Sequence, residues 1–549
     1  MEDSKQSDLI DRTRHAVGAF TTELKTTWRL ARMHVEKSNK DVLNIIDKAL
    51  FVLSLDHEAP NTDADVVQFA SHGTSRTNEN GIQVGTCTNR YYDKLNLIVT
   101  ENSIAACVYP ASAMDGTTVL RFISDIYTDS VLRLARKING VFFTLWGDTN
   151  TVPIHEDIDK PTFFKLKFQL TPELKTGLHL AETRLADIIH QHEYISRKIE
   201  GFGNTYIAQK MNLPPDSLIQ TCIQIAYYAL YGKMCPSTEP VTTRKFKNAR
   251  TEPISVQSES MQTLCQTFIS QVSNEEKWVA LLSAVNEHKK KVVNAMQGNG
   301  FERHLSALRS AFIQQEMLYK LHPQLPRIPN NLARVAPPFL FEPSLEALYK
   351  PELLVANCGN PALHLFGVTP AIPTGFGIGY IIKDESISFV GSSQWRQTER
   401  FLDTLTSVFD EVKNMWKAIV LPHTSVATRA TRGGFDSAAG SDNSNYTYQK
   451  TRNQQLQEYV SSLPMTMVAS NNAMNSKSID SKQVDDTDHT PTPSHILGGY
   501  DYFDVGDFNF RSEMASRAQS RTMTRTNSAS NLPVAPMGVG KKLQLNEDY

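Results

Sequence analysis

One sharp change of composition divides this chain and limits what it can fold into. From residue 1 to about 423, apolar runs with helical or strand-like spacing alternate with short turns. From Ala427 onward the sequence consists mainly of Ser, Thr, Asn, Asp and Gln, with few aliphatic residues. Such a composition buries too little apolar surface to offset the entropy lost on ordering the chain. We therefore expect the packed core to lie within residues 1–423 and residues 424–549 to form a low-complexity, mostly disordered tail.

Two features of the tail are candidates for binding a protein partner. An aromatic and acidic segment, GGYDYFDVGDFNF, occupies residues 498–510. After it, Arg517, Arg521 and Arg525 each precede a Ser or Thr by three residues, which is the spacing of a basic kinase site. A polar tail also produces this spacing by chance, and the aromatic segment fits an ordinary sticky loop equally well. A protein partner for residues 498–530 is therefore a prediction with an open alternative.

The balance of charges excludes two classes of partner. The 549 residues include 56 Lys and Arg against 58 Asp and Glu, which gives a formal net charge of −2. A chain so nearly neutral has no general electrostatic attraction to nucleic acid or to an anionic membrane surface. No run approaches the roughly 18 apolar residues that are needed to span a bilayer. We expect neither a nucleic-acid partner nor a membrane partner.

The cysteines and the first residues indicate a compartment. Six cysteines are scattered without a Cys-x-x-Cys pair, which favours free thiols in a reducing compartment over disulfides or a zinc site. The opening residues, MEDSKQSDLIDR, are followed by no apolar run and resemble neither a secretory signal nor a transit peptide. The expected location is cytoplasmic, and no metal is expected.

Periodic patterns predict an α/β or α+β fold with mixed sheets. β-Branched and aromatic runs bounded by turn residues predict strands, and apolar residues at helical spacing predict helices. One helix is expected to begin at Asp216, with that aspartate as its N-cap. The predicted strands are 95–100, 104–110, 141–147, 163–170, 351–358 and a hairpin over 375–391, and the predicted helices are 174–200, 216–231, 275–322 with a break near 298–300, and 398–418.

No general catalytic motif is present. The sequence has no G-x-S-x-G, no Walker loop, no H-E-x-x-H and no G-x-G-x-x-G between a strand and a helix. GFGIG (375–379) is rich in glycine, but it leads into a predicted strand and therefore indicates a tight start of that strand. Motifs of this kind leave the function open.

Longer segments carry more information than these motifs. In chain order they are GAFTTELKTTWRLAR from Gly18, NRYYDK from Asn89, PPDSLIQTCIQIAYYALYGK from Pro214, TTRKFKNARTEPI from Thr242, GNGFERHLSAL from Gly298, and NCGNPALHLFGVTPAIPTGFGIGY from Asn357. Together they resemble the carnitine/choline acyltransferase family, and most closely its fungal cytoplasmic carnitine O-acetyltransferases. The resemblance covers roughly residues 17 to 423.

The resemblance implies a CoA-dependent acyltransferase fold of two related halves, each an open mixed sheet with helices. It assigns residues 17–155 to a truncated N-terminal half that carries the active-site motif, and residues 156–423 to the C-terminal half. Roughly the first third of a family member is expected to be absent. Carnitine and acetyl-CoA would be the small-molecule partners, with coenzyme A as co-substrate and no covalently bound cofactor.

The resemblance also shows where a catalytic base is missing. In that family one histidine, within E-H-x-x-x-[DE]-G, takes the proton from carnitine's hydroxyl or from the thiol of coenzyme A. The matching stretch here ends in Asp115-Gly116 and places Ala111 at the histidine position. Alanine cannot accept a proton, so no catalytic residue is intact. Residues 354–356, Leu-Val-Ala, stand where the family has a Ser-Thr-Ser that supports the oxyanion and carnitine.

Supporting and carnitine-binding roles follow in the same way. Asp115 and Arg250 match a buried acid–arginine pair that holds the active-site loop in the family. Thr251 and Arg303 match residues that contact carnitine, and Thr238 replaces a tyrosine that does so. For Arg303, local pairing with a neighbouring glutamate, at position 302 or 316, is the alternative.

The candidate contacts to coenzyme A are less complete. After Gly203 the two lysines that the family offers to a phosphate are absent, and Lys210 is the candidate to compensate. The other candidates are Asp216, Lys289 and Asn357.

Three interpretations of the function remain. The chain is a working carnitine O-acetyltransferase whose missing groups are supplied elsewhere, a pseudoenzyme that acts through interactions, or a fragment of a longer transferase. Loss of a positioned acid–base group alone lowers a rate by about 10²–10⁴. We therefore expect family membership together with weak or no catalysis.

Overall fold

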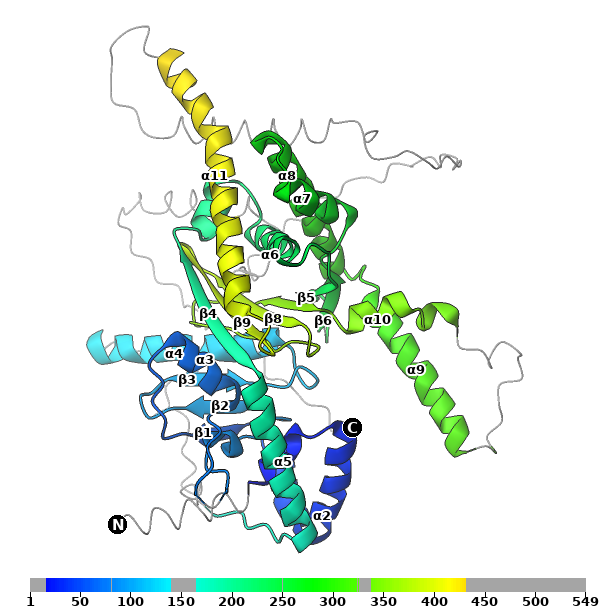
Figure 1. Cartoon of the computed structure of the whole chain (residues 1–549). Coiled ribbons are helices and arrows are strands. Elements are labelled where there is room, and N and C mark those ends of the chain that lie inside the picture. Colours follow the sequence, from blue (N-terminus) through cyan, green and yellow to red (C-terminus); the bar gives the residue numbers. More distant parts are fainter. Residues whose placement is uncertain are drawn as a thin grey trace, which may run out of the picture. The chain divides into compact units, whose positions relative to one another are not determined.

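Two mixed β-sheets with their helices make up the part of the chain that the structure describes (Figure 1). The computed structural model describes residues 16–79, 81–139, 164–248, 250–322, 324 and 337–430. All of these residues belong to one compact unit, Met1–Val505, and the second unit, Gly506–Tyr549, lies outside them.

The smaller sheet has three strands in the order β1-β2-β3. β1 (Val52–Leu55) runs parallel to β2 (Asn96–Val99), and β3 (Ala105–Val108) runs antiparallel to β2. This confirms the strands predicted at 95–100 and 104–110. The helical elements of this region are η1 (Val17–Thr22), α2 (Lys25–Lys48), α3 (Asp63–His72), η2 (Thr86–Asn89) and α4 (Gly116–Asn139).

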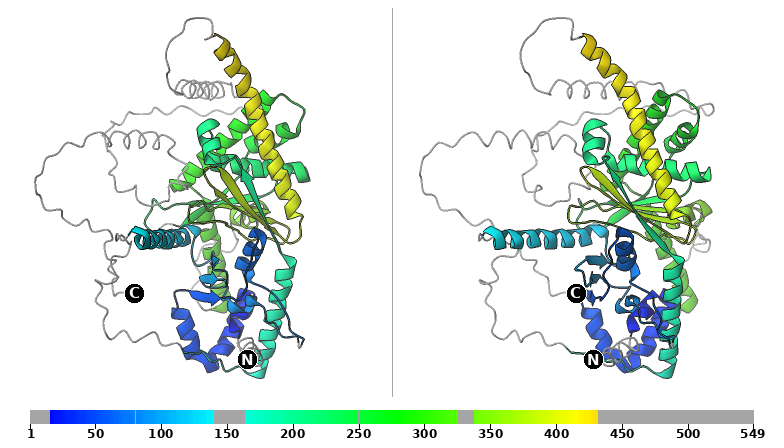
Figure 2. Two further views of the ribbon diagram at one scale, coloured as in Figure 1. Left: turned by 90° about the vertical axis from the view of Figure 1, so that its left-hand side faces the viewer. Right: turned by 60° about the vertical axis from the view of Figure 1, so that its left-hand side comes forward.

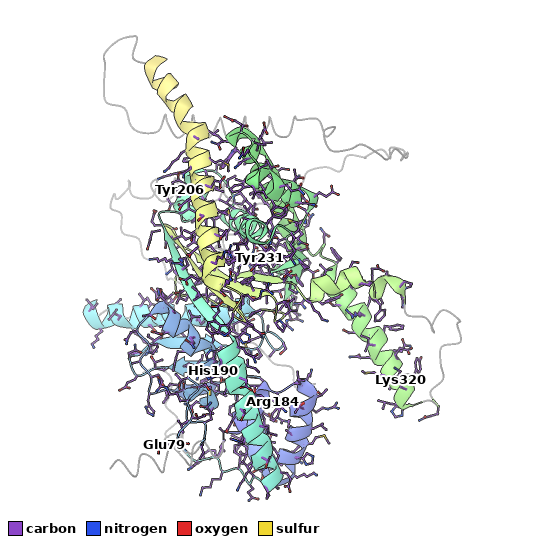
Figure 3. All side chains as sticks on the ribbon, in the orientation of Figure 1. Glu79, Arg184, His190, Tyr206, Tyr231 and Lys320 are labelled. Carbon is purple, nitrogen blue, oxygen red and sulfur yellow. The ribbon has the colours of Figure 1, made fainter. Side chains whose placement is uncertain are left out.

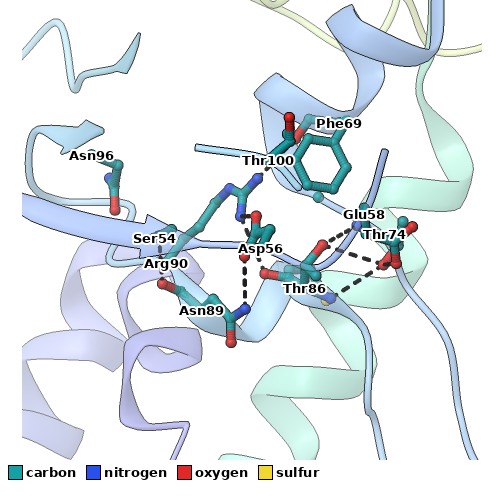
Figure 4. Close-up of polar contacts among 12 residues, drawn as sticks. Ser54, Asp56, Glu58, Phe69, Thr74, Thr86, Asn89, Arg90, Asn96 and Thr100 are labelled. Carbon is teal, nitrogen blue, oxygen red and sulfur yellow. Dashed lines mark hydrogen bonds and ion pairs between the residues drawn. The ribbon is translucent and has the colours of Figure 1, made fainter. Parts of the chain in front are cut away.

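A buried arginine ties the elements around this sheet together (Figure 4). Arg90 is fully buried, and its Nη1 donates to Oδ2 of Asp56 at 3.0 Å while its Nη2 donates to the carbonyl oxygen of Phe69 at 2.9 Å. The Asp56 carboxylate also accepts a hydrogen bond of 2.8 Å from Nδ2 of Asn89. Since Asn89 and Arg90 begin the NRYYDK segment, the network gives that segment a structural role.

The larger sheet has six strands in the order β4-β9-β8-β7-β5-β6. β4–β9, β8–β9 and β5–β6 are antiparallel pairs, whereas β7–β8 and β5–β7 are parallel. Both sheets therefore contain both pairings, which confirms the predicted mixed sheets. The strands are β4 (Glu193–Glu200), β5 (Ser237–Thr242), β6 (Thr251–Ser255), β7 (Leu353–Asn357), β8 (Phe376–Ile382) and β9 (Ser386–Ser393).

Helices pack against the larger sheet and complete its core. α6, α8 and α11 contact one another, and α11 also contacts β4 and β9 along the sheet (Figure 2). Apolar side chains from these helices and the central strands form the largest buried cluster among the described residues. The helical elements are α5 (Pro172–Gln191), η3 (Thr205–Lys210), α6 (Pro215–Tyr231), α7 (Glu259–Ile269), α8 (Asn274–Met296), α9 (Glu302–Leu321), η4 (Pro338–Leu340), α10 (Pro343–Tyr349) and α11 (Thr398–Ala430).

The predicted hairpin over 375–391 is confirmed, and its glycines have a packing reason. β8 begins at Phe376, so GFGIG is the start of a strand. A Cβ placed on Gly377 would lie 2.3 Å from the carbonyl oxygen of Val368, and one on Gly379 would lie 2.3 Å from that of Phe366. Glycine is required at both positions because a neighbouring backbone segment crosses β8 at close range.

Two predicted elements are wrong. Residues 193–200, predicted as the end of a helix, form the edge strand β4. Residues 164–170, from the strand predicted at 163–170, form no strand. Instead, the backbone N–H of Gln169 donates to the side chain of Asn39, whose Nδ2 donates to the carbonyl oxygen of Gln169. A side chain here takes the place of a neighbouring strand.

Helix ends also differ from the predictions. α6 begins at Pro215, so Asp216 lies within its first turn and does not cap it. The break predicted near 298–300 is confirmed, because α8 ends at Met296 and α9 begins at Glu302. α11 continues to Ala430, past the predicted start of the tail at 424. The predicted strand 141–147 and the tail beyond residue 430 lie outside the described residues.

Candidate functional site

Ala111 lies in a tight turn between β3 and α4. The N–H groups of Ala113 and Met114 donate to the carbonyl oxygen of Pro110, at 3.0 and 3.3 Å, and close the turn. Ala111 is exposed, so its methyl group ends in open space. The turn presents no proton-accepting side chain at position 111.

Arg250, the residue directly before β6 of the larger sheet, holds this turn. Nη2 of Arg250 donates to Oδ1 of Asp115 at 2.9 Å, and its Nε donates to Oδ2 at 3.2 Å. Nη2 also donates to the carbonyl oxygen of Ala111 at 3.3 Å. The hydrogen bonds and the charge of Asp115 raise the pKa of Arg250. The contact predicted for this pair is therefore present, but its predicted burial is wrong for the arginine, whose side chain is 52% exposed.

The two residues expected to recognise carnitine touch each other directly. Arg303, in the first turn of α9, donates through Nε to the carbonyl oxygen of Thr251 at 3.0 Å and through Nη2 to its hydroxyl at 3.3 Å. Arg303 forms no ion pair with Glu302 or Glu316 within the ranges that the structure covers, so the alternative of local pairing is not observed. Because Thr251 follows Arg250 in sequence, the start of β6 is bonded both to the Ala111 turn and to α9.

The remaining family positions around the sheet lack polar groups suited to catalysis. Thr238 is almost fully buried on β5, opposite Ser255 of β6 and Leu354 of β7. Residues 354–356 lie within β7, where Val355 and Ala356 are buried. An oxyanion requires hydrogen-bond donors aimed at it, and the side chains of residues 354–356 carry none.

The candidate coenzyme A residues fall into two groups. Nδ2 of Asn357 donates to Oδ1 of Asp216 at 2.8 Å, and the Tyr380 hydroxyl donates to the same oxygen at 2.6 Å. Nζ of Lys210 lies 5.2 Å from the ring centroid of Tyr206, which is labelled in Figure 3. Lys289 lies half-buried on α8. Neither lysine is bonded to the Asp216–Asn357 pair within the described ranges, so the structure brings together only two of these four residues.

A buried chain of hydrogen bonds was not predicted from the sequence. Nδ1 of His288 lies 3.0 Å from the hydroxyl oxygen of Ser217, and its Nε2 lies 2.9 Å from Oε2 of Glu239. All three side chains are almost completely buried, and the charge of Glu239 reaches the neighbouring Asp216. A serine, a histidine and a glutamate hydrogen-bonded in this order are the arrangement of an activated serine nucleophile. Because all three side chains are buried, a substrate has no access to this serine. Here the chain of hydrogen bonds joins α6, β5 and α8. A histidine on an apolar helix face was the only signal for it.

The buried groups of this cluster predict that stability falls as pH rises through neutrality. Burial raises the pKa of Asp216 to about 7, with a further contribution from Glu239, and burial raises that of Glu239 to about 7. Burial lowers the pKa of His288 to about 4. Below about pH 6.5 the histidine and the carboxyls have opposite effects on the pH dependence of the free energy of unfolding. The unfolded chain binds a proton on the histidine that the folded chain does not bind, whereas the folded chain keeps carboxyl protons that the unfolded chain releases. Above that pH only the carboxyls act, so the free energy of unfolding is expected to fall as pH rises through 7.

Urea unfolding at several values between about pH 6.5 and 8 measures this fall, which reaches at most about 1.4 kcal/mol per pH unit and group. Glu239→Gln is expected to make this fall shallower, because it removes one of the two carboxyls. Glu411→Gln, at an exposed carboxylate paired with Lys277, is the matched control and should leave it unchanged. A slope that Glu239→Gln leaves intact would assign the pH dependence to other groups.

The comparison with known families decides the assignment. The profile described as Choline/Carnitine o-acyltransferase matches residues 1–407. The chain belongs to this family. The match confirms the resemblance and, with the mixed sheets and helices described above, the expected fold class. Among the described residues, no helix combines the length and the apolar composition that a membrane span requires.

Individual carnitine acyltransferases are similar to this family member over most of its length. Carnitine O-acetyltransferase YAT2 of Saccharomyces cerevisiae is 36% identical over 459 residues, covering 75% of this chain and 49% of that protein. Carnitine O-acetyltransferase of Mus musculus is 26% identical over 384 residues, with coverages of 69% and 55%. Mitochondrial carnitine O-palmitoyltransferase 2 of Homo sapiens is 26% identical over 399 residues, with coverages of 72% and 54%. The chain thus spans about half the length of these curated relatives.

Proposed function

We propose that this member of the choline/carnitine acyltransferase family binds carnitine and coenzyme A but transfers acetyl groups weakly or not at all. The observation that carries the proposal is the methyl group of Ala111 in the turn held by Arg250. Attack on a thioester by carnitine's hydroxyl requires a group that accepts the hydroxyl proton, and such a group contributes about 10²–10⁴ to the rate.

The titratable groups near the turn do not replace a histidine. Burial raises the pKa of Tyr109 above its usual range, and it raises the pKa of Cys107 to about 11 and that of Cys358 to about 12. All three groups therefore hold their protons near neutral pH. The carboxylate of Asp115 is occupied by the two hydrogen bonds from Arg250.

The absence of hydroxyls at residues 354–356 lowers the expected rate further. Loss of one oxyanion donor costs about 10²–10³ in turnover. Binding is less affected, because Arg303 and Thr251 keep donors that suit a carboxylate and a hydroxyl. A pseudoenzyme that binds its family's ligands fits this combination. A cytoplasmic location and a protein partner for residues 498–530 stay predictions.

Calorimetric titration of the unmodified chain tests the binding part of the proposal. L-Carnitine and coenzyme A, added separately, are expected to give saturable heat, with dissociation constants of about 1 mM or tighter. Choline, which has no carboxylate for Arg303, serves as the matched control and should bind more weakly than carnitine. Absence of heat for both carnitine and coenzyme A would overturn a ligand-binding role.

A further inference from the structure

The start of α9 is held by a carboxylate from a different element. Oε1 of Glu252, on β6, accepts the backbone N–H of Glu302 at 2.9 Å and that of Arg303 at 3.3 Å. Phe301, the residue before the helix, provides no side-chain cap. The first N–H groups of a helix have no partner within it, and an acidic side chain near them is favourable. Glu252 therefore does for α9 what a cap residue normally does locally.

The chain around this carboxylate is shaped to admit it. Glu252 is 8% exposed, so few water molecules compete for its oxygen. A Cβ placed on Gly300 would lie 2.3 Å from Cγ of Glu252 and 2.4 Å from Oε1. The absence of a side chain at position 300 lets the backbone pass over the carboxylate and turn into the helix.

The same carboxylate determines where Arg303 stands. Arg303 is the second residue of α9, and its guanidinium donates to Thr251, the residue immediately before Glu252. One short stretch of β6 thus fixes both the backbone and the side chain of the arginine. Release of the backbone from Glu252 would let the first turn of α9 fray and would move the guanidinium away from Thr251.

We propose that Glu252 is a positioning residue that holds Arg303 and Thr251 in the arrangement that receives the carboxylate of a carnitine-type ligand. The inference rests on the proposed function, since it concerns the same two residues. Glu252 does not itself contact the ligand in this account. It acts through the helix start, and its influence is therefore confined to the carnitine side of the site.

Two measurements on four variants test the role of Glu252. In Glu252→Ala, affinity for carnitine is expected to fall about 3- to 30-fold, the range typical of losing a helix cap, while affinity for coenzyme A is retained. Amide hydrogen exchange in a peptide covering residues 301–306 should lose protection by a similar factor. Glu252→Gln keeps an acceptor oxygen and should restore most of both. Glu259→Ala removes an exposed glutamate from the first turn of α7 and should change neither. Arg303→Ala should weaken carnitine binding but leave the amides protected.

The outcomes distinguish a failure of the positioning role of Glu252 from a failure of the proposed function. Unchanged protection or unchanged carnitine affinity in Glu252→Ala overturns the positioning role, as does an equal loss for coenzyme A. If the unmodified chain binds no carnitine, the proposed function fails, whereas the exchange data still report on the helix start. Should Glu252→Ala not fold, Gly300→Ala replaces it, because the added methyl group pushes the carboxylate away from the same two N–H groups. Full protection in Gly300→Ala would then count against the role.

Discussion

Ala111→His is expected to raise carnitine-dependent release of thiol from acetyl-CoA by about 10²–10⁴ over the unmodified chain. The substitution places an imidazole on the turn that the Arg250–Asp115 contact already holds in position. An imidazole has an unperturbed pKa of about 6.5, so it accepts a proton near neutral pH, which the tyrosine and thiols around it do not. Absolute rates should stay below those of ordinary enzymes, because residues 354–356 still carry no oxyanion donor.

Ala113→His is the matched control for this gain. Ala113 is exposed in the same turn, so the variant adds the same imidazole two positions away. It is expected to show no carnitine-dependent gain. An equal increase in both variants would indicate nonspecific imidazole catalysis, and no increase in Ala111→His would show that the turn does not occupy the reacting position.

Arg90→Met is expected to lower the free energy of unfolding by about 3–5 kcal/mol. The substitution removes the positive partner of Asp56 and leaves that carboxylate in a fully buried site. It also removes donors to the carbonyl oxygens of Phe69 and Thr86. Chemical unfolding followed by circular dichroism provides the measurement.

Two further variants separate charge burial from simple loss of contacts around Arg90. Asp56→Asn in the Arg90→Met background should recover part of the loss, because it removes the uncompensated charge. Arg197→Met breaks an ion pair with Asp403 in which both side chains are exposed, at 35% and 59%, and it should cost about 0–1 kcal/mol. A cost for Arg90→Met that is no larger than that for Arg197→Met would contradict the account of the buried network.

Local pattern was sufficient to predict much of the larger sheet and its helices. α6 and β7 were correctly placed because their apolar residues lie in the core, although α6 is buried on all sides from Asp216 to Tyr227 and not only along its apolar stripe. The edge strand β4 was missed because EYISRKIE lacks the regular apolar–polar alternation of a half-buried strand and directly follows a helix. Its strand conformation depends on pairing with β9, which lies far away in the sequence.

The candidate site was predicted as separate residues, and its contacts were not. Asp115 and Arg250 lie 135 positions apart, and their half-exposed geometry depends on how β6 meets the Ala111 turn. The roles of Glu252 and His288 required tertiary contacts that leave no local pattern. Glu252 precedes α9 by about 50 residues, and His288 lies on a helix whose apolar spacing alone explains its burial.

Turnover by the unmodified chain tests most directly the claim that position 111 lacks a base. Thiol release from acetyl-CoA is followed with and without carnitine at saturating concentrations, and acetylcarnitine is identified by mass spectrometry. We expect the two rates to agree, or to differ by a turnover at least about 10²-fold below the ordinary enzymatic range of roughly 1–10³ per second. Carnitine-dependent formation of acetylcarnitine within that range would contradict the claim and establish a working transferase.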